Sequence, residues 1–219
     1  MQKTNNPQIY QLDKIFLTKN LTPGKKASQE RLFFDKNNEY REWSPKTSKI
    51  AAALRNKLSN LHLKEGDIIL YLGASSGTTV SHISDIIGTQ GLLFAVEISP
   101  TMMRELFFLC ETRKYIALIL ADANQPQTYA NKIIPVDWLY QDISQRNQTE
   151  IFIKNLSFLK KNGHAILALK ARSVNVAKDP QKIFEETKQE LQKHVEVLET
   201  ITLEPYQKDH CLFVCRKIK

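Results

Sequence analysis

From Gly66 onward, short blocks of apolar residues alternate with segments of helical periodicity. The blocks are almost continuously apolar, which is typical of strands buried on both faces of a sheet. This alternation predicts an α/β fold in which helices cover both faces of a mostly parallel sheet. The expected strands are 67–72, 92–96, 115–120, 136–140 and 164–169, and the expected helices are 78–87, 101–112, 149–159 and 180–193.

The chain then ends on two strand-like runs, 196–203 and 210–217. Six residues join them and no helical segment lies between them, so the two strands should pair antiparallel. The expected sheet therefore has seven strands, six of them parallel and the last one antiparallel and inserted. This arrangement is found in many methyltransferases.

The first 45 residues follow a different pattern, with short alternating stretches at 8–13, 14–19, 31–34 and 39–42. The dipeptides Pro23-Gly24 and Asn37-Asn38 separate them, which predicts the hairpins of a small antiparallel sheet. After Pro45 the spacing becomes helical over residues 49–61. We therefore expect a small N-terminal β domain at 1–45 and a larger domain at 46–219.

The net charge of +8 is unevenly placed along the chain. Residues 1–66 carry +7 and residues 151–219 carry +5, whereas residues 67–150 carry −4. A basic surface at both ends fits either a solvated, lysine-rich exterior or a surface that binds a polyanion. The charge alone does not distinguish the two.

The remaining composition restricts the cellular setting. No apolar run approaches the roughly 18 residues that a membrane-spanning helix needs, and the polar N-terminus does not resemble a secretory signal. Cys110, Cys211 and Cys215 are too few for a disulfide framework, and His210 near the last two completes no metal-ligand set. We expect reduced, packed thiols, no metal, no membrane contact and a cytoplasmic location.

The strongest local motif is a buried strand that leads through a turn of small residues, 73–77, into a helix. A ligand can approach the backbone closely at the carboxyl ends of parallel strands. Carboxylates follow the next three strands, as Glu97, Asp122 and Asp142. Such an acidic cleft suits a cationic nucleoside without phosphates, and S-adenosylmethionine is such a molecule. The turn has two alternative explanations. It could be only a tight connection between strand and helix, or it could belong to a dinucleotide-dependent oxidoreductase, although the third glycine of the dinucleotide-binding motif is missing here.

Four further side chains should converge beside that cleft: Lys49, Asp142, Lys170 and His210. Lys170 ends a buried strand, so desolvation and nearby Lys49 would lower its pKa. Asp142 would oppose this shift by pairing with Lys170, and the sequence does not decide the net direction. Taken alone, His210 is more simply explained as a packed or surface histidine.

Three motifs resemble fibrillarin, the 2′-O-methyltransferase of box C/D ribonucleoproteins: 41–45, 70–85 and 202–210. The resemblance implies a class I, Rossmann-like, S-adenosylmethionine-dependent methyltransferase fold with a small N-terminal sheet domain. It assigns catalysis to Lys49, Asp142, Lys170 and His210. It assigns cofactor contacts to Gly73, Ala74, Thr78, Thr79, Glu97, Asp122, Ala123, Asp142 and Gln145.

The chain departs from the family pattern in places. Ser75 stands where the family usually has alanine, Ile98 replaces an aromatic residue after Glu97, and Tyr140-Gln141 replaces a small residue before Asp142. Ile98 still supplies an apolar wall for an adenine ring. The glycine- and arginine-rich tail of eukaryotic members is absent, so the resemblance is to the shorter, archaeal type.

The expected activity is methyl transfer to a ribose 2′-oxygen of rRNA, and by extension of tRNA, within a box C/D guide particle. The alternative is a catalytically weak RNA-binding assembly subunit of the same particle. No RNA-reading motif is present, so guide RNA should select the target RNA. The resemblance implies a Nop-domain scaffold protein and a kink-turn-binding, ribosomal-type protein as partners. Met102, Met103 and Phe107 are candidates for docking, although their spacing fits core packing better.

Overall fold

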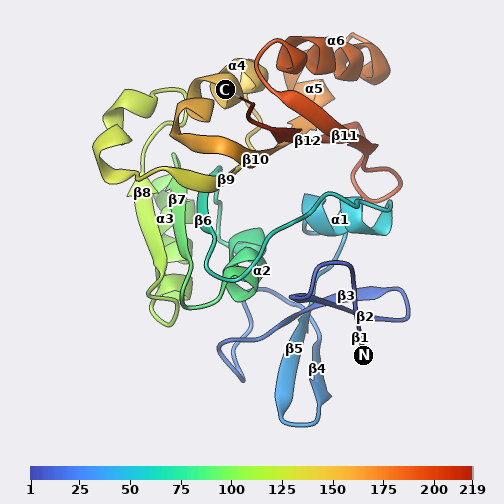
Figure 1. Cartoon of the computed structure of the whole chain (residues 1–219), viewed down its shortest axis with the longest axis vertical. Helices are drawn as coiled ribbons and strands as arrows, with labels where there is room; N and C mark the ends of the chain where they lie inside the picture. The colour runs from blue at the N-terminus through green and yellow to red at the C-terminus, as the bar shows by residue number, and fades with distance from the viewer. Residues whose placement is uncertain (219) are drawn as a thin grey trace.

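The computed structural model describes residues 1–218 and contains two β-sheets (Figure 1). The larger sheet has the strand order β11-β12-β10-β9-β6-β7-β8. Strand β12 is antiparallel to both of its neighbours, and the pairs among β10, β9, β6, β7 and β8 are parallel. The predicted fold class is confirmed. The strands are β6 (Ile68–Leu72), β7 (Leu92–Glu97), β8 (Ile116–Leu120), β9 (Val136–Gln141), β10 (Leu159–Lys170), β11 (Glu196–Thr202) and β12 (His210–Arg216).

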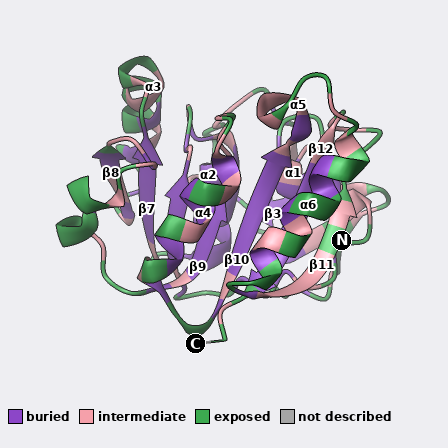
Figure 2. Ribbon diagram, turned by 90° about the horizontal axis from the view of Figure 1, so that it is seen from above, coloured by how far each residue is buried: buried purple, intermediate pink, exposed green. Residues whose placement is uncertain are grey.

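Helices cover both faces of this sheet, and Figure 2 shows its strands largely buried between them. On one face, apolar residues of α1, α2 and α3 form a core with β6 and β7. On the other face, α4 and α6 pack on β9 and β10. The helices are α1 (Lys49–Arg55), α2 (Thr78–Ile87), α3 (Pro100–Cys110), α4 (Gln148–Asn155), α5 (Ala171–Val174) and α6 (Pro180–Gln192), with 3₁₀ turns η1 (Pro126–Thr128), η2 (Ala130–Lys132) and η3 (Leu156–Phe158).

Helix α1 is shorter than its sequence pattern predicts. The expected helix extended to Leu61, but α1 ends at Arg55. Lys57 has a left-handed backbone with φ of 70°, and the Asn56 side chain donates to the carbonyls of Thr202 and Glu204, each at 2.7 Å. These tertiary contacts end the helix, and Leu61 reaches the core from a loop instead.

The boundary between α4 and β10 also differs from the prediction. The expected helix 149–159 is α4 followed by the 3₁₀ turn η3, and Leu159 already belongs to β10. The register of β10 on β9 shifts between Leu159 and His164, so residues 160–163 form an irregular, bulged part of the strand. Gly163 is required there because a Cβ atom would lie 2.9 Å from the Lys160 carbonyl oxygen.

The side-chain environments of the cysteines and of Phe107 can be compared with expectation. All three cysteines are free and buried, and burial raises the pKa of Cys110 to about 11 and those of Cys211 and Cys215 to about 12. The packed, reduced thiols predicted from the sequence are therefore confirmed. Core packing was the wrong interpretation for Phe107, whose side chain on α3 is 55% exposed.

The smaller sheet is antiparallel throughout and has the order β1-β2-β3-β5-β4. The pairs β2–β3 and β4–β5 are the predicted hairpins, whereas β1 was not predicted because it contains only two residues. In Figure 1 this sheet lies below α1 and α2. Its strands are β1 (Gln2–Lys3), β2 (Ile9–Leu12), β3 (Ile15–Lys19), β4 (Leu32–Asp35) and β5 (Asn38–Glu42).

A buried ionic network of Glu30, Arg41, Asp85 and Arg113 connects the smaller sheet to helix α2 and to the segment that follows α3. Arg41 on β5 contacts Asp85 on α2 at 2.6 Å, and Arg113 contacts the other oxygen of Asp85 at 2.5 Å. Glu30 pairs with Arg41 at 2.9 Å, and no side chain of the network is more than 2% exposed. The network fixes α2 against the smaller sheet.

His82, also on α2, adds a second buried contact between the sheets. Its Nδ1 lies 2.8 Å from the Thr18 hydroxyl of β3, and its ring stacks on Trp43 with centroids 5.3 Å apart. Burial, together with Arg41 and Arg113, holds the pKa of His82 well below its usual value. The imidazole is therefore neutral at neutral pH.

None of the helices within residues 1–218 has the length and apolar character needed to cross a lipid bilayer. The same residues contain no group of three or more histidine, cysteine, aspartate and glutamate side chains arranged to hold a metal ion.

Candidate functional site

The turn after β6 packs closely between the ends of β7 and β9. Gly73 has φ of +82°, and a Cβ atom there would overlap the carbonyl oxygen of Asp142. The amides of Gly73 and Ala74 donate to the Val96 carbonyl at 2.9 and 3.1 Å, and the Asp142 amide donates to the Leu72 carbonyl at 2.9 Å. This close packing is possible only for glycine at position 73.

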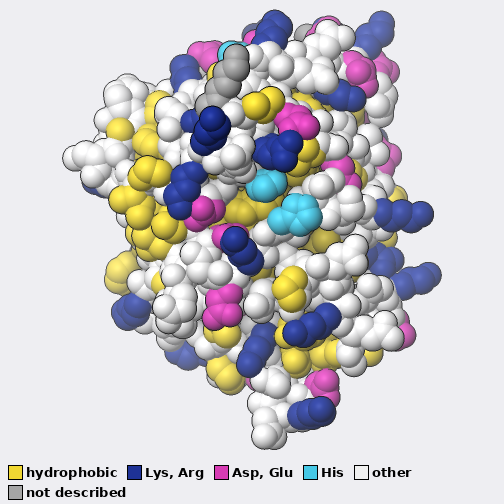
Figure 3. All heavy atoms as spheres, in the orientation of Figure 1, with side chains coloured by type: hydrophobic (Ala, Val, Ile, Leu, Met, Phe, Trp, Pro, Cys, Tyr) yellow, Lys and Arg dark blue, Asp and Glu magenta, His cyan; other side chains and the backbone are white. Residues whose placement is uncertain are grey.

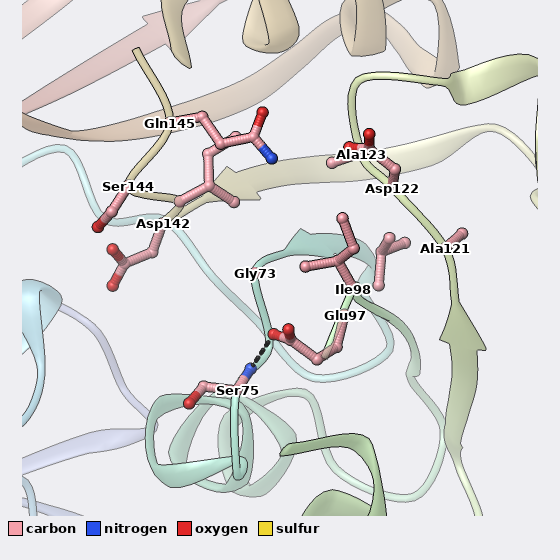
Figure 4. A pocket seen from close by; sticks show the side chains of 12 residues that line it. Gly73, Ser75, Glu97, Ile98, Ala121, Asp122, Ala123, Asp142, Ser144 and Gln145 are labelled. Carbon is pink, nitrogen blue, oxygen red and sulfur yellow. Dashed lines mark hydrogen bonds between the residues drawn. The ribbon is translucent and has the colours of Figure 1, made fainter. Parts of the chain in front are cut away.

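A cavity of about 270 Å³ opens at the carboxyl ends of β6, β7, β8 and β9 (Figure 4). Six predicted residues line it: Gly73, Glu97, Asp122, Ala123, Asp142 and Gln145. Ser75, Val96, Ile98, Ala121, Ile143 and Ser144 complete its wall. The carboxylates that follow three successive strands thus lie in one cavity, as the sequence predicted.

Glu97 is the most firmly held of these carboxylates. One oxygen accepts the amide of Ser75 at 2.8 Å (Figure 4), and the other accepts the amide of Ser99 at 2.8 Å. The residue is only 8% exposed. Each carboxylate oxygen has two lone pairs, so Glu97 keeps acceptor capacity for two vicinal hydroxyl groups of a ligand. The sequence did not single out Ser75 or Ser99, because their amides act regardless of side-chain identity.

The opposite end of the cavity combines a carboxylate with apolar walls. Asp122 accepts the amide of Asn124 at 2.9 Å, which orients its carboxylate after β8. Ile98 is 55% exposed and, in Figure 4, points into the cavity near Ala121 and Ala123. Ile98 therefore supplies the apolar wall expected in place of an aromatic residue.

A second cavity of about 280 Å³ shares Gly73, Ser75 and Asp142 with the first. The predicted residues Lys49, Ala74, Thr78 and Thr79 line this one. Thr47, Tyr71 and Ser76 line it as well and were not predicted. Burial, assisted by the charge of Asp142, raises the pKa of Tyr71 well above its usual value, so its phenol stays neutral.

Lys49 and Asp142 form a direct ion pair at the second cavity. The Lys49 Nζ lies 2.8 Å from Asp142 Oδ2, and both side chains are about one-fifth exposed. The sequence-based expectation that Asp142 pairs with Lys170 is wrong. Helix α1 starts at Lys49 and brings that side chain to Asp142, and Lys170 belongs to no ion pair among residues 1–218.

Lys170 and His210 face each other across β10 and β12. They are register partners in this antiparallel pair, so their side chains lie on the same face of the sheet. The amide and carbonyl of Lys170 are both bonded by the buried Gln148 side chain, each at 3.1 Å. Gln148 was not predicted, because a buried glutamine leaves no periodic pattern in the sequence.

The ring of His210 is held by one hydrogen bond. Its Nδ1 lies 2.6 Å from the Lys208 carbonyl oxygen, which only accepts, so Nδ1 carries the proton and Nε2 is the free nitrogen of the neutral ring. Burial lowers the pKa of His210, and the Lys208 hydrogen bond partly opposes this shift. The charges of Lys49 and Lys170 lower this pKa further, and the charge of Asp142 raises it. His210 itself lines a separate cavity of about 230 Å³ with Thr202, Glu204 and Asp209.

The sheet order, the inserted antiparallel β12 and the acidic cavity define the class of the protein, which is a class I methyltransferase fold. The model of the Fibrillarin family matches residues 2–219, and the chain belongs to this family. A fibrillarin-like rRNA/tRNA 2′-O-methyltransferase of Thermococcus sibiricus is 47% identical over 201 residues, which cover 91% of this chain and 89% of the relative.

Two solved structures are similar over nearly the whole chain. Aeropyrum pernix fibrillarin in complex with natively bound S-adenosyl-L-methionine has a TM-score of 0.86 and 39% identity, covering 94% of this chain and 92% of that one. The fibrillarin of a fibrillarin/Nop5p complex has a TM-score of 0.88 and 35% identity, covering 96% and 98%. Both sequence identities are high enough for the similarity to reflect a shared family and not only a shared fold.

Proposed function

We propose that this chain is an S-adenosylmethionine-dependent 2′-O-methyltransferase of rRNA and tRNA and the catalytic subunit of a box C/D guide ribonucleoprotein. The observation that carries this proposal is the arrangement of the two joined cavities. One presents Glu97 and Asp122, and the other ends at the Lys49–Asp142 pair. The relatives named above, one acting on rRNA and tRNA and one with the cofactor bound, support it.

The cavities fit the cofactor in charge and in shape. Glu97, fixed by two backbone amides, is placed to accept both ribose hydroxyls. Asp122 and Ala123 are placed to receive the adenine amino group, and Ile98 packs on the ring. When bound, S-adenosylmethionine supplies a methyl group on an electrophilic sulfonium.

The turn and the second cavity are assigned to the other end of the cofactor. The backbone of Gly73 and Ala74, kept open by the absence of a Cβ at Gly73, lies against it. Thr78 and Thr79 at the start of α2 offer hydroxyl groups, and Gln145 offers an amide from the first cavity. Asp142 contacts both cavities and so lies where the methyl group is presented.

The four polar side chains are assigned to the transfer itself. Alignment of the ribose oxygen with the methyl group supplies much of the rate, because the sulfonium needs little further activation. The Lys49 ammonium, oriented by Asp142 at 2.8 Å, stabilises the developing alkoxide, and Lys170 adds a second positive charge. His210 accepts the proton at Nε2, since its lowered pKa keeps the ring neutral.

Other molecules complete the particle. The fibrillarin/Nop5p complex supports a Nop-domain scaffold as a partner of this chain. We assign target choice to the guide RNA and assembly on that RNA to a kink-turn-binding protein. Because the similar proteins are archaeal, we propose that the particle acts in the cytoplasm.

The test uses the assembled particle, labelled cofactor and two target RNAs that differ only in the 2′-hydroxyl of one nucleotide. We expect label only on the target that keeps the hydroxyl, and equal labelling of both would refute the proposal. His210→Ala should slow transfer roughly 10²- to 10⁴-fold, the usual contribution of a general base. His194→Ala, at an exposed site, is the matched control. A catalytically weak assembly subunit would instead show no saturable binding of S-adenosylmethionine.

A further inference from the structure

A groove lies at the amino ends of β6, β9 and β10, on the sheet edge opposite the cofactor cavities. It has a volume of about 330 Å³. We call it the histidine groove, and it is lined by His62, Lys64, Asp67, Asp137, Trp138, Lys160, Lys161, Asn162, Gly163 and His164. Figure 3 shows two histidine side chains next to each other on this face, among lysines or arginines and carboxylates. The proposed reaction uses none of these side chains.

Aromatic rings form a short stack in the groove. His164 stacks on Trp138 with centroids 4.8 Å apart and planes inclined by 21°, and His62 contacts His164 edge to face at 5.8 Å. Trp138 is buried and His164 is half-buried, whereas His62 is exposed. The stack therefore ends in a flat ring that is open to solvent and supported from below.

The carboxylates in the groove are already engaged by the chain. Asp67 accepts the amide of Lys64 at 2.9 Å, and Asp137 accepts the amide of Ile68 at 3.0 Å and pairs with Lys160 at 2.8 Å. Neither Lys64 nor Lys161 takes part in any ion pair among residues 1–218. Two exposed ammonium groups thus remain available for an anion.

The irregular first part of β10, which carries Lys160 and Lys161, is fixed in place. The Asn162 amide donates to the Lys217 carbonyl, and the Lys217 amide donates to the Gly163 carbonyl, both at 2.9 Å. Asn162 has φ of 62°, and a side chain at Gly163 would collide with Leu159. The backbone that carries the two lysines is therefore held by the sheet, which reduces the entropy lost on binding a ligand.

We propose that the histidine groove binds single-stranded RNA, with one base stacked on His62 and the neighbouring phosphates held by Lys64 and Lys161. Single-stranded nucleic acid needs both a ring for stacking and cations for its backbone, and the groove offers both. An acidic peptide would use only the cations. The choice of RNA rests on the proposed function, and the groove adds to it a second contact that anchors RNA away from the reacting nucleotide.

The first experiment measures binding of a fluorescent eight-nucleotide oligouridylate to the full chain by anisotropy. We expect His62→Ala to weaken binding roughly five- to tenfold, through loss of one stacked base. The double variant Lys64→Ala, Lys161→Ala should lower the slope of log affinity against log salt by about 1.4, at roughly 0.7 for each phosphate on a single strand. His194→Ala and Lys26→Ala, at exposed sites outside the groove, are matched controls and should bind as the unmodified chain does.

The second experiment locates the contact by crosslinking an oligonucleotide that contains 4-thiouridine. Crosslinks at residues 62–64 and 160–164 would support the proposal. Crosslinks confined to the carboxyl edge of the sheet, or unchanged affinity in both groove variants, would overturn it. So would a polyglutamate peptide that binds the groove as tightly and with the same salt slope. S-adenosylmethionine binding should be unaltered in the groove variants, because the cofactor cavities lie at the opposite edge of the sheet. Failure of the unmodified chain to bind the cofactor or to transfer its methyl group would count against the proposed function instead.

Discussion

Replacing Asp85 with alanine is expected to destabilise the protein by about 3–5 kcal/mol, the usual cost of removing one partner of a buried ion pair. Asp85 is fully buried and accepts hydrogen bonds from Arg41 at 2.6 and 3.0 Å and from Arg113 at 2.5 Å. Without it, Arg41 keeps only Glu30 as a charged partner. Arg113 keeps only neutral acceptors, such as the Ser84 hydroxyl at 2.8 Å.

Two further variants separate the charge from the packing. Asp85→Asn keeps the shape and one acceptor oxygen, so its cost should be smaller, about 1.5–3 kcal/mol for lost hydrogen bonds to a charged group. Glu105→Ala, which changes an exposed carboxylate on α3, should stay within about 0.5 kcal/mol of the unmodified chain. Since domains of this kind have about 5–15 kcal/mol of stability in total, the difference is easily measured.

The assay is urea unfolding at pH 7 followed by far-ultraviolet circular dichroism, with the slope m compared among variants. The double variant Asp85→Ala, Arg113→Met should recover part of the loss, because it removes one of the unpaired cations. If Asp85→Ala unfolded within 1 kcal/mol of Glu105→Ala, the network would not stabilise the contact between the sheets and the reasoning would be wrong.

Three other outcomes follow from the structure. Glu97→Gln turns an amide NH₂ toward one of two backbone donors, so calorimetry should show S-adenosylmethionine binding weakened roughly 10- to 100-fold, and unchanged affinity would contradict the assigned role. Gly73→Ala places a Cβ against the Asp142 carbonyl at φ of +82°, so the same titration should show no saturable binding. His82 is neutral in both the folded and unfolded states above pH 6.5, but between pH 6.5 and its lower folded pKa only the unfolded state takes up a proton. In urea unfolding, the free energy of unfolding should therefore be lower at pH 5.5 than at pH 6.5, with about 1 kcal/mol of the decrease due to His82. This part of the decrease should be absent from His82→Asn. Equal decreases in the two proteins would contradict the prediction.

The seven strands were predictable because each is a distinct apolar block with its own flanking turns. The cavity carboxylates were predictable for the same reason, since Glu97 ends β7, and Asp122 and Asp142 come within two residues of the ends of β8 and β9. The topology of a parallel sheet then brings them to one edge without any knowledge of tertiary contacts.

Features set by long-range contacts were not predictable from local patterns. Helix α1 ends at Arg55 because Asn56 bonds backbone carbonyls near residue 203, about 150 positions away. Asp142 pairs with Lys49 rather than Lys170, since side-chain reach depends on where α1 begins on the sheet. The buried network around Asp85 joins four segments of the chain through side-chain contacts, and no local pattern predicts which charged residues meet.

The last strand of the chain, β12, is inserted between β10 and β11, so one edge of β10 is covered only by residues at the end of the sequence. Residues that line the first cofactor cavity end at Gln145, whereas His210 arrives only with the last strand. Until β12 enters the sheet, β10 has an open edge and Lys170 has no residue opposite it. Every residue that lines the first cavity thus precedes Lys170 and His210 in the chain, so the final strand is the one that completes the set of four polar side chains.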